Sequence, residues 1–180
     1  MKYLDGNKER IQTIFVTGRI KELIITQGGK NVAPVPIEDS IKSKLPKIIS
    51  QAVLVGDNKK YVSCLFTLQV AADPQTMLPT EILDPGAVSW CKDVLGETEG
   101  SQVKSISDFL SGPHSERLRA GIQKGLDEYN REAETQVHQV KKFCILPSEF
   151  SFQGGELGPT LKLKRHVVTK KYEDVINSMY

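Results

Sequence analysis

The sequence predicts an α+β fold, with a small antiparallel or mixed sheet and flanking helices. Two observations predict it. Short β-branched or alternating apolar runs occur in both halves of the chain, and a stretch with helical periodicity separates them. The chain has 180 residues, of which 39% are hydrophobic and 26% are charged. This balance is typical of a globular protein and suits one domain with a substantial core.

The first predicted elements are two strands and a glycine turn. Residues 13–17 are β-branched and apolar, and residues 23–25 form a second strand. Residues 27–31 are the turn, because Gly28 and Gly29 permit positive φ and leave room for a close neighbour. Taken alone, this turn indicates only a hairpin.

A helix is predicted over residues 36–45, with Pro36 in its first turn, where a missing N–H has no cost. Glu38 and Asp39 would favour the positive end of that helix. Apolar side chains spaced i, i+4 and i+8 give it one buried face, namely Ile37, Ile41 and Leu45.

The rest of the chain alternates between β and helical pieces. An antiparallel hairpin is predicted from strands at 52–56 and 61–69, and residues 71–84 are predicted to be a loop. Asp84 and Pro85 begin a helix that runs to about residue 95. The other predicted elements are a helix of roughly ten residues from 101, a helix at 114–133, a strand at 139–146, an extended segment at 160–165 and an amphipathic helix at 167–180.

Composition excludes several classes of protein. The net charge is only +2, so a basic patch has to be argued locally. No apolar run approaches the ~20 residues of a membrane helix, and the polar N-terminus has no signal-peptide core. Three widely spaced cysteines predict buried, reduced thiols in a cytoplasmic protein, and three histidines show no ligand spacing; these residues are Cys64, Cys91, Cys144, His114, His138 and His166.

The glycine turn has no phosphate-binding pattern, because Gly28 and Gly29 lead into extended backbone and not directly into a helix. Bare glycine backbone beside Lys30 could instead allow an elongated ligand to lie along the chain.

A second candidate region is basic: six of the ten residues at 162–171 are Lys, Arg or His. Three interpretations are open. It could be a solvated edge, a binding surface for nucleic acid or anionic membrane, or a loop that delivers one lysine into an active site. The absence of interleaved aromatic residues argues against a single-strand binder. Glycines at 154, 155 and 158 would let such a loop swing.

The two regions together resemble the C-terminal domain of adenylate-forming enzymes, the superfamily of acyl-CoA synthetases, luciferases and peptide-synthetase adenylation domains. The stretch GRIKELIITQGGKNVAPVPIE resembles its G-R-x-[KD] segment, hairpin, glycine turn and P-x-x-I-E helix start. The stretch GGELGPTLKLKR resembles the catalytic-lysine loop of the long-chain fatty acid branch. In amino-acid sequence, the two stretches are most similar to bubblegum-type very-long-chain acyl-CoA synthetases.

The resemblance implies a two-step ligase mechanism that uses ATP, Mg²⁺ and CoA, none of them bound tightly by this segment. Lys162 would be the catalytic lysine of acyl-adenylate formation, with Lys164 as the alternative when the loop is counted from its threonine. Lys21 would be the hinge and Arg19 would lie on the nucleotide side. A CoA tunnel would be lined by Gly28, Gly29 and Lys30.

The resemblance also implies partners that this sequence lacks. The nucleotide loop and the fatty acid pocket belong to a large N-terminal domain, so this segment alone should be inactive. Residues 1–17 would be a linker and first strand, and residues 18–180 the lid domain, with a helical insertion at about 71–137. The expected partners are the large domain, fatty acid, ATP and CoA, with no nucleic acid; peripheral membrane association of the parent enzyme is open. The alternative function is a non-catalytic basic module for anionic surfaces.

Overall fold

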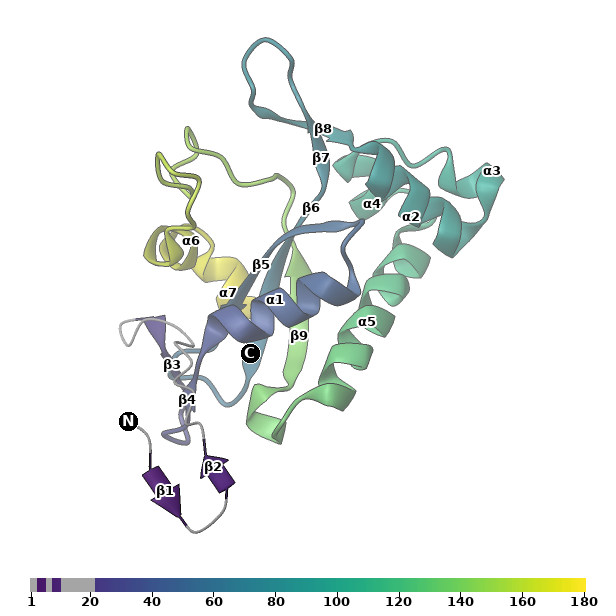
Figure 1. Cartoon of the computed structure of the whole chain (residues 1–180). Coiled ribbons are helices and arrows are strands. Elements are labelled where there is room, and N and C mark those ends of the chain that lie inside the picture. The colour runs from purple at the N-terminus through teal and green to yellow at the C-terminus, as the bar shows by residue number, and fades with distance from the viewer. Residues whose placement is uncertain (1–2, 6–7, 11–21) are drawn as a thin grey trace.

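A three-stranded mixed sheet forms the centre of the protein (Figure 1). In the computed structural model, the described residues are 3–5, 8–10 and 22–180. Strand β6 (Val62–Leu68) lies between β5 (Ile49–Val55), to which it is antiparallel, and β9 (Val140–Ile145), to which it is parallel. The predicted α+β fold and the β5–β6 hairpin are confirmed.

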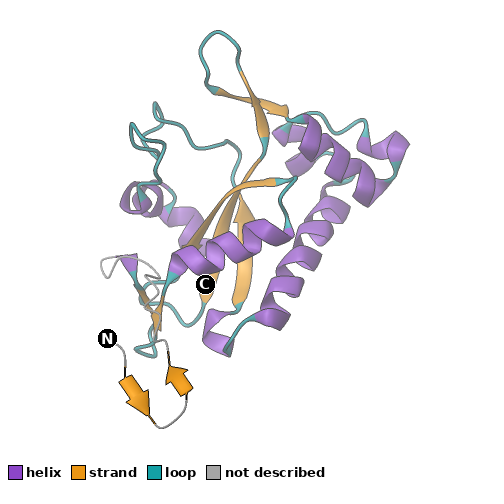
Figure 2. Cartoon of the chain, viewed as in Figure 1, coloured by secondary structure: helices purple, strands orange, loops and turns teal. Residues whose placement is uncertain are grey.

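Both faces of this sheet are covered by helices, which explains why every residue of β6 is buried. On one face, apolar side chains pack with helices α1 (Pro34–Lys44), α2 (Pro85–Leu95) and α5 (Ser115–Glu132). On the other face, a smaller cluster packs with α6 (Arg165–Lys171) and α7 (Glu173–Ser178). Figure 2 shows the resulting layers of helix and strand.

Helix α1 starts earlier than the sequence predicted, at Pro34. Its first turn therefore contains no acidic residue, and the prediction that Glu38 and Asp39 favour the positive helix end is wrong. Glu38 is instead buried and faces away from solvent. The proline that occupies the first position is Pro34, which loses no hydrogen bond there.

Residues 71–84 are not a simple loop. Strands β7 (Val70–Ala72) and β8 (Pro79–Leu83) pair as an antiparallel hairpin that projects from the body (Figure 1). Asp73 organises its turn, since one carboxylate oxygen accepts the backbone N–H groups of Gln75 and Thr76 at 2.8 Å each. The prolines obscured this hairpin in the sequence, although a proline is tolerated at the first residue of a strand.

The helical block agrees with prediction in part. Asp84 caps α2 by accepting the Ala87 N–H at 2.7 Å, and α5 matches its predicted range closely. The predicted break after α2 contains a short helix, α3 (Glu97–Gly100). The helix predicted from residue 101 is instead α4 (Ile106–Ser111), because the capping box that starts it lies at Ser105.

Both termini differ from expectation in detail. Near the N-terminus, β1 (Tyr3–Asp5) pairs with β2 (Lys8–Arg10), and the predicted strand at 13–17 lies outside the described residues. The C-terminal helix is divided into α6 and α7, which meet at Tyr172. A 3-10 turn, η2 (Gln136–His138), leads into β9.

The cysteines are free thiols, as the sequence predicted. Cys64 and Cys91 are buried and Cys144 is half-buried. Burial raises the pKa of Cys91 to about 12, and that of Cys64 well above its usual value. Such thiols are poor nucleophiles at neutral pH.

Candidate functional site

The glycine turn joins two short strands, β3 (Ile24–Ile25) and β4 (Asn31–Val32). Gly29 has φ +69°, a conformation that glycine adopts without strain, and its N–H donates to the Thr26 carbonyl at 2.8 Å. A Cβ added at Gly28 or Gly29 would meet no atom within 4 Å. The room at this turn therefore faces outward, and no part of the described chain fills it.

This hairpin is fastened to the turn between β5 and β6. The Ile25 N–H donates to the Asp57 carboxylate at 3.0 Å, and the Gln27 N–H donates to the Lys59 carbonyl at 2.9 Å. A third bond runs from the Asn58 N–H to the Ile25 carbonyl at 2.8 Å. These bonds hold the exposed glycine turn at a fixed place on the sheet.

The predicted catalytic-lysine loop is a tight turn, so the prediction of an extended segment at 160–165 is wrong. The Gly158 N–H donates to the Lys162 carbonyl at 2.8 Å, and the Leu161 N–H donates to the Gly158 carbonyl at 2.9 Å. Leu157 and Leu163 form an isolated antiparallel bridge below this turn. Leu161 has φ +57°, which reverses the chain direction just before Lys162.

The turn separates the two candidate lysines. Lys162 is exposed at the position where the turn closes, and no salt bridge to it occurs among the described residues. Lys164 lies at the base, where it precedes α6 and lines an open cleft of about 950 Å³.

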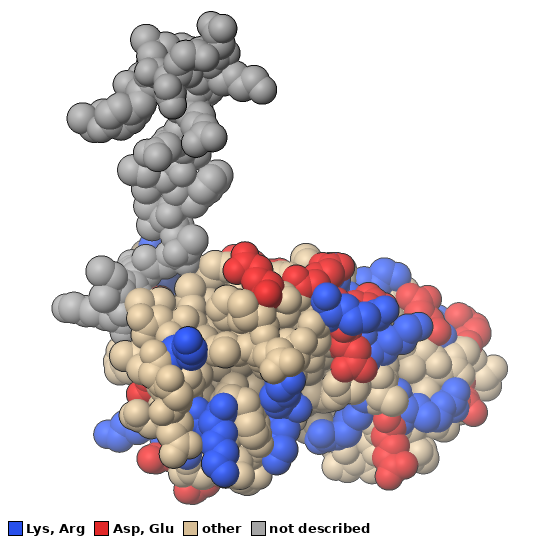
Figure 3. All heavy atoms as spheres, turned by 90° about the horizontal axis from the view of Figure 1, so that it is seen from below, with Lys and Arg blue, Asp and Glu red and all other residues tan. Residues whose placement is uncertain are grey.

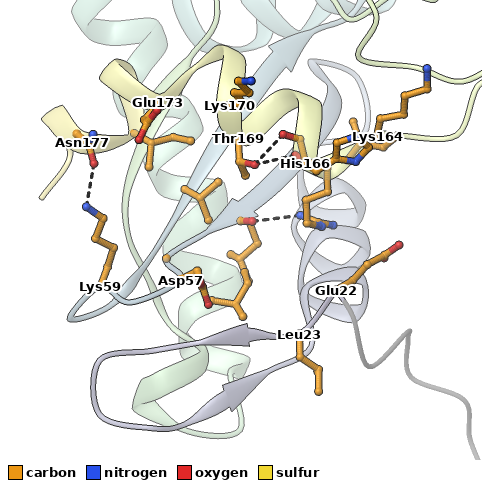
Figure 4. A pocket seen from close by; sticks show the side chains of 17 residues that line it. Glu22, Leu23, Asp57, Lys59, Lys164, His166, Thr169, Lys170, Glu173 and Asn177 are labelled. Carbon is orange, nitrogen blue, oxygen red and sulfur yellow. Dashed lines mark hydrogen bonds between the residues drawn. The ribbon is translucent and has the colours of Figure 1, made fainter.

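Figure 4 shows this cleft between α6 and the start of the β3–β4 hairpin. Lys164, His166 and Lys170 line its α6 side, while Glu22 and Asp57 lie opposite. The cleft walls thus carry charges of both signs. Lys162 is not among its lining residues.

Arg165 connects the lysine turn to helix α1. Its guanidinium forms a two-pronged ion pair with Glu38, with Nη1 2.6 Å from Oε1 and Nη2 2.8 Å from Oε2. Nη1 also donates to the Leu54 carbonyl at 3.1 Å, and the Leu54 N–H donates to Glu38 Oε1 at 2.6 Å. Strand β5 therefore lies in the same hydrogen-bonded group as the two predicted motifs.

The basic segment is less free than its composition suggests. Arg165 is committed to Glu38, and Lys171 forms a close ion pair with the buried carboxylate of Glu156. On the face drawn in Figure 3, basic side chains are interspersed with acidic and uncharged ones. A continuous anion-binding surface is not visible on that face.

Two residues of this site were missed by sequence reasoning, Glu38 and Glu156. Glu38 was assigned to a helix end, and Glu156 was not singled out. The one local signal for Glu156 is the pair of glycines directly before it, which allows its side chain to fold back on the loop. Arg19 and Lys21 lie outside the described residues, so their predicted roles are not addressed by the geometry.

The comparison with protein families decides the assignment. Residues 21–85 match the family described as the AMP-binding enzyme C-terminal domain. This part of the chain belongs to that family of C-terminal domains. The matched residues include the β3–β4 hairpin with its glycine turn, helix α1 and the β5–β6 hairpin.

Relatives of this C-terminal domain are named long-chain-fatty-acid–CoA ligases. The chain is 45% identical to ACSBG1 of Mus musculus over 167 residues, which is 93% of this chain and 22% of the relative. It is 44% identical to ACSBG2 of Xenopus laevis over 175 residues, or 97% of this chain and 23% of the relative. The chain thus spans about a quarter of the length of these relatives.

Solved adenylation domains share the fold. The adenylation domain of a carboxylate reductase from Mycobacterium chelonae superposes with a TM-score of 0.61 at 16% identity, over 90% of this chain and 20% of that one. The adenylation domain of a carboxylic acid reductase from Segniliparus rugosus superposes with a TM-score of 0.59 at 15% identity. This match covers 91% of this chain and 20% of that one. No helix in the part of the chain that the structure describes is long and apolar enough to span a membrane.

Proposed function

We propose that this chain is the mobile C-terminal domain of a long-chain fatty acid–CoA ligase. In this proposal Lys162 serves acyl-adenylate formation, and the Gly28–Gly29 hairpin serves thioester formation. Residues 18–180 are the lid domain, residues 1–17 are the linker and first strand, and residues about 71–137 are an insertion. The names of the relatives support the reaction class. The geometry of the two turns supports the assignment of one turn to each half-reaction.

The proposal depends mainly on the exposed position of Lys162 on a fixed turn. Lys162 is an exposed residue that closes a tight turn, on a stem that is fixed by backbone hydrogen bonds. A buried lysine or one held in an ion pair could not reach another domain without losing its partner. Lys164, the alternative, lies at the base of the stem and lines the cleft.

In the first step, a carboxylate oxygen of the fatty acid would attack the α-phosphorus of ATP, and pyrophosphate would leave as the bond to the α-phosphorus breaks. Both reactants are anionic. A lysine ammonium that contacts the carboxylate and the phosphate oxygens together offsets their repulsion and aligns them. In this proposal, the exposed Lys162 enters the active site of the large domain.

In the second step, the CoA sulfur would attack the acyl carbonyl, and AMP would leave. The Gly28–Gly29 turn suits the wall of a narrow tunnel because it presents bare backbone with open space beside it. Lys30, beside the turn, is exposed as well. Lys21 as the hinge and Arg19 on the nucleotide side complete the proposal, since a change in φ and ψ at a few linker residues is sufficient to rotate a domain.

The nucleotide, Mg²⁺ and fatty acid would be held by the large domain. Within residues 3–5, 8–10 and 22–180, no group of three or more His, Cys, Asp or Glu side chains is placed to hold a metal ion. The part of the chain that fits a ligand of the reaction is the glycine turn, which has room for the slender arm of CoA.

The test uses the intact ligase polypeptide that contains this chain, with the two half-reactions measured separately. Lys162→Ala is expected to lower acyl-adenylate formation by about 10²-fold or more and to leave thioester formation from supplied acyl-adenylate within about twofold. Lys164→Ala is the matched control. Equal loss of both half-reactions in Lys162→Ala, or a selective loss only in Lys164→Ala, would overturn the assignment.

A further inference from the structure

A buried carboxylate lies at the foot of the lysine turn. Glu156 is only 2% exposed, although it is in the loop between β9 and α6. Its Oε1 forms a close ion pair with Lys171 Nζ on α6 and lies 3.4 Å from the Tyr172 hydroxyl. Its Oε2 accepts the Ser151 N–H at 3.4 Å. One side chain therefore connects the incoming loop to the helix that follows the turn.

The backbone of Glu156 belongs to the stem of the same turn. The Glu156 carbonyl accepts the Lys164 N–H at 2.7 Å. The Leu157–Leu163 bridge and the bond from Gly158 N–H to the Lys162 carbonyl follow in order toward the tip. Any displacement of Glu156 would therefore be transmitted along these pairs to Lys162.

The glycines before Glu156 explain how its carboxylate is accommodated. A Cβ at Gly154 would lie 2.2 Å from Glu156 Oε2, so only glycine leaves space for the side chain to fold back. Gly155 has φ +85°, which directs the chain into this arrangement. The expectation that these glycines let the loop swing is replaced by a packing role at Gly154 and a conformational role at Gly155.

The tip of the turn has little support of its own. Leu161, beside Lys162, is 71% exposed and has positive φ, an uncommon conformation for a residue with a Cβ. At the foot, burial is the largest single influence on Glu156 and opposes its ionisation. The hydrogen bond from Lys171, the backbone N–H groups of Glu156 and Ser151 and the charge of Lys171 together outweigh burial, so the pKa of the carboxyl is lowered. The foot of the stem is thus held by the ion pair between Lys171 and the buried Glu156, whereas Leu161 at the tip is exposed to solvent.

We infer that Glu156 and Lys171 are positioning residues for Lys162, and that their ion pair fixes the stem so that the Lys162 ammonium enters the adenylation site in one orientation. This inference rests on the proposed role of Lys162. Displacement of a catalytic group by about 1 Å is sufficient to cost ~10²-fold in rate. The pair therefore acts on the first half-reaction, while thioester formation, which uses the Gly28–Gly29 hairpin, is independent of it.

The test compares Lys171→Met, Lys171→Arg and Glu156→Gln in the intact ligase. Lys171→Met and Glu156→Gln are expected to lower kcat of acyl-adenylate formation by about 10- to 100-fold, with KM for fatty acid and ATP changed by less than about threefold. Lys171→Arg keeps the charge pair and is expected to restore most of the rate. Glu132→Gln, which breaks the exposed Lys44–Glu132 pair of 2.6 Å, is the control and should change neither half-reaction.

A second readout does not depend on activity. In this chain by itself, Lys171→Met should speed amide hydrogen exchange at Gly158 and Lys164 by about tenfold and leave β5 and β6 unchanged. Lys171 is partly exposed, so this variant tests the inference even where Glu156→Gln does not fold.

The outcomes separate this inference from the proposed function. If Lys162→Ala leaves adenylation intact, the proposed function fails, and this inference fails with it. If Lys162→Ala abolishes adenylation while folded Lys171→Met remains within twofold of the parent, only the positioning role is overturned. Equal loss of both half-reactions in Lys171→Met would also overturn it, since that would indicate general destabilisation.

Discussion

Glu38 and Arg165 form a two-pronged ion pair across 127 positions of sequence, with N–O distances of 2.6 and 2.8 Å. Glu38 is on the helix that follows the glycine hairpin, and Arg165 begins the helix that follows the lysine turn. Their side chains are 7% and 15% exposed. The two motifs that resemble adenylate-forming enzymes are thus joined within one rigid group, so a rotation of the domain would move both together.

This relationship predicts a large loss of stability when one partner is removed. Glu38→Gln leaves the Arg165 guanidinium without a counter-charge in a largely buried place, and we expect the free energy of unfolding to fall by about 3 kcal/mol or more. Asp93→Asn, which breaks the exposed Lys47–Asp93 pair of 3.0 Å, should cost at most about 1 kcal/mol. Urea unfolding of the chain measures both, and similar small losses would contradict the prediction.

Glu149 predicts a pH dependence of stability. Burial raises the pKa of its carboxyl in spite of hydrogen bonds from Ser50, Thr67 and the Phe150 N–H, and the charge of nearby Glu156 adds to the increase. Within the described part of the chain, its Oε2 has no hydrogen-bond partner. The folded state therefore favours the protonated form. The contribution of Glu149 is fully present below its unfolded pKa of about 4.3 and is lost as pH rises through the folded pKa.

Glu149→Gln removes this titration, since glutamine stays neutral. Relative to the variant, the parent protein should lose stability as pH rises from the unfolded pKa of about 4.3 through the raised pKa of the folded state. Thermal or urea unfolding at several pH values gives this difference. Glu81→Gln, at an exposed position of β8, is the control for the loss of one surface carboxylate. A flat difference for Glu149→Gln would show that the carboxyl titrates normally.

Leu161 predicts that a substitution beside the proposed catalytic lysine will stabilise the fold. The residue is in the left-handed region at φ +57°, and its side chain is 71% exposed, so little packing offsets the strain. Asparagine tolerates this conformation better than leucine. We expect Leu161→Asn to raise the free energy of unfolding by up to about 1 kcal/mol, and Leu157→Asn, at a buried position, to lower it. A loss of stability in Leu161→Asn would show that the leucine is supported by contacts.

Local patterns were sufficient to predict the parts of the fold with local causes. Asp84 and Pro85 marked the start of α2, and alternation marked β6. The pairing of Glu38 with Arg165 could not be predicted, because no local pattern links residues so distant in sequence. Glu156 was missed for a related reason: a glutamate in a glycine-rich loop is usually solvated, and only the fold of the loop brings Lys171 to it.

The order of the two site motifs along the chain was predicted better than their geometry. The sequence placed a glycine turn early and a lysine loop late, but the tight turn that ends at Lys162, with positive φ at Leu161, was not predicted. Hairpin β7–β8 was missed because its prolines and polar residues resemble a loop, and its pairing is stabilised by a bond from the Thr80 hydroxyl to the Ala71 carbonyl.

At Gly28, a substitution is expected to reduce activity without changing the stability of the fold. A Cβ at this position meets nothing within 4 Å, and its φ is not in the left-handed region, so Gly28→Leu should change the stability of the chain by less than about 0.5 kcal/mol. Under the proposed function, the leucine side chain would obstruct the CoA arm at the tunnel wall. Thioester formation from supplied acyl-adenylate should then fall by about 10-fold or more, while acyl-adenylate formation stays unchanged. Gln27→Leu, next to it and exposed, is the matched control. Loss of both half-reactions, or equal losses in both variants, would place the CoA arm elsewhere on the domain.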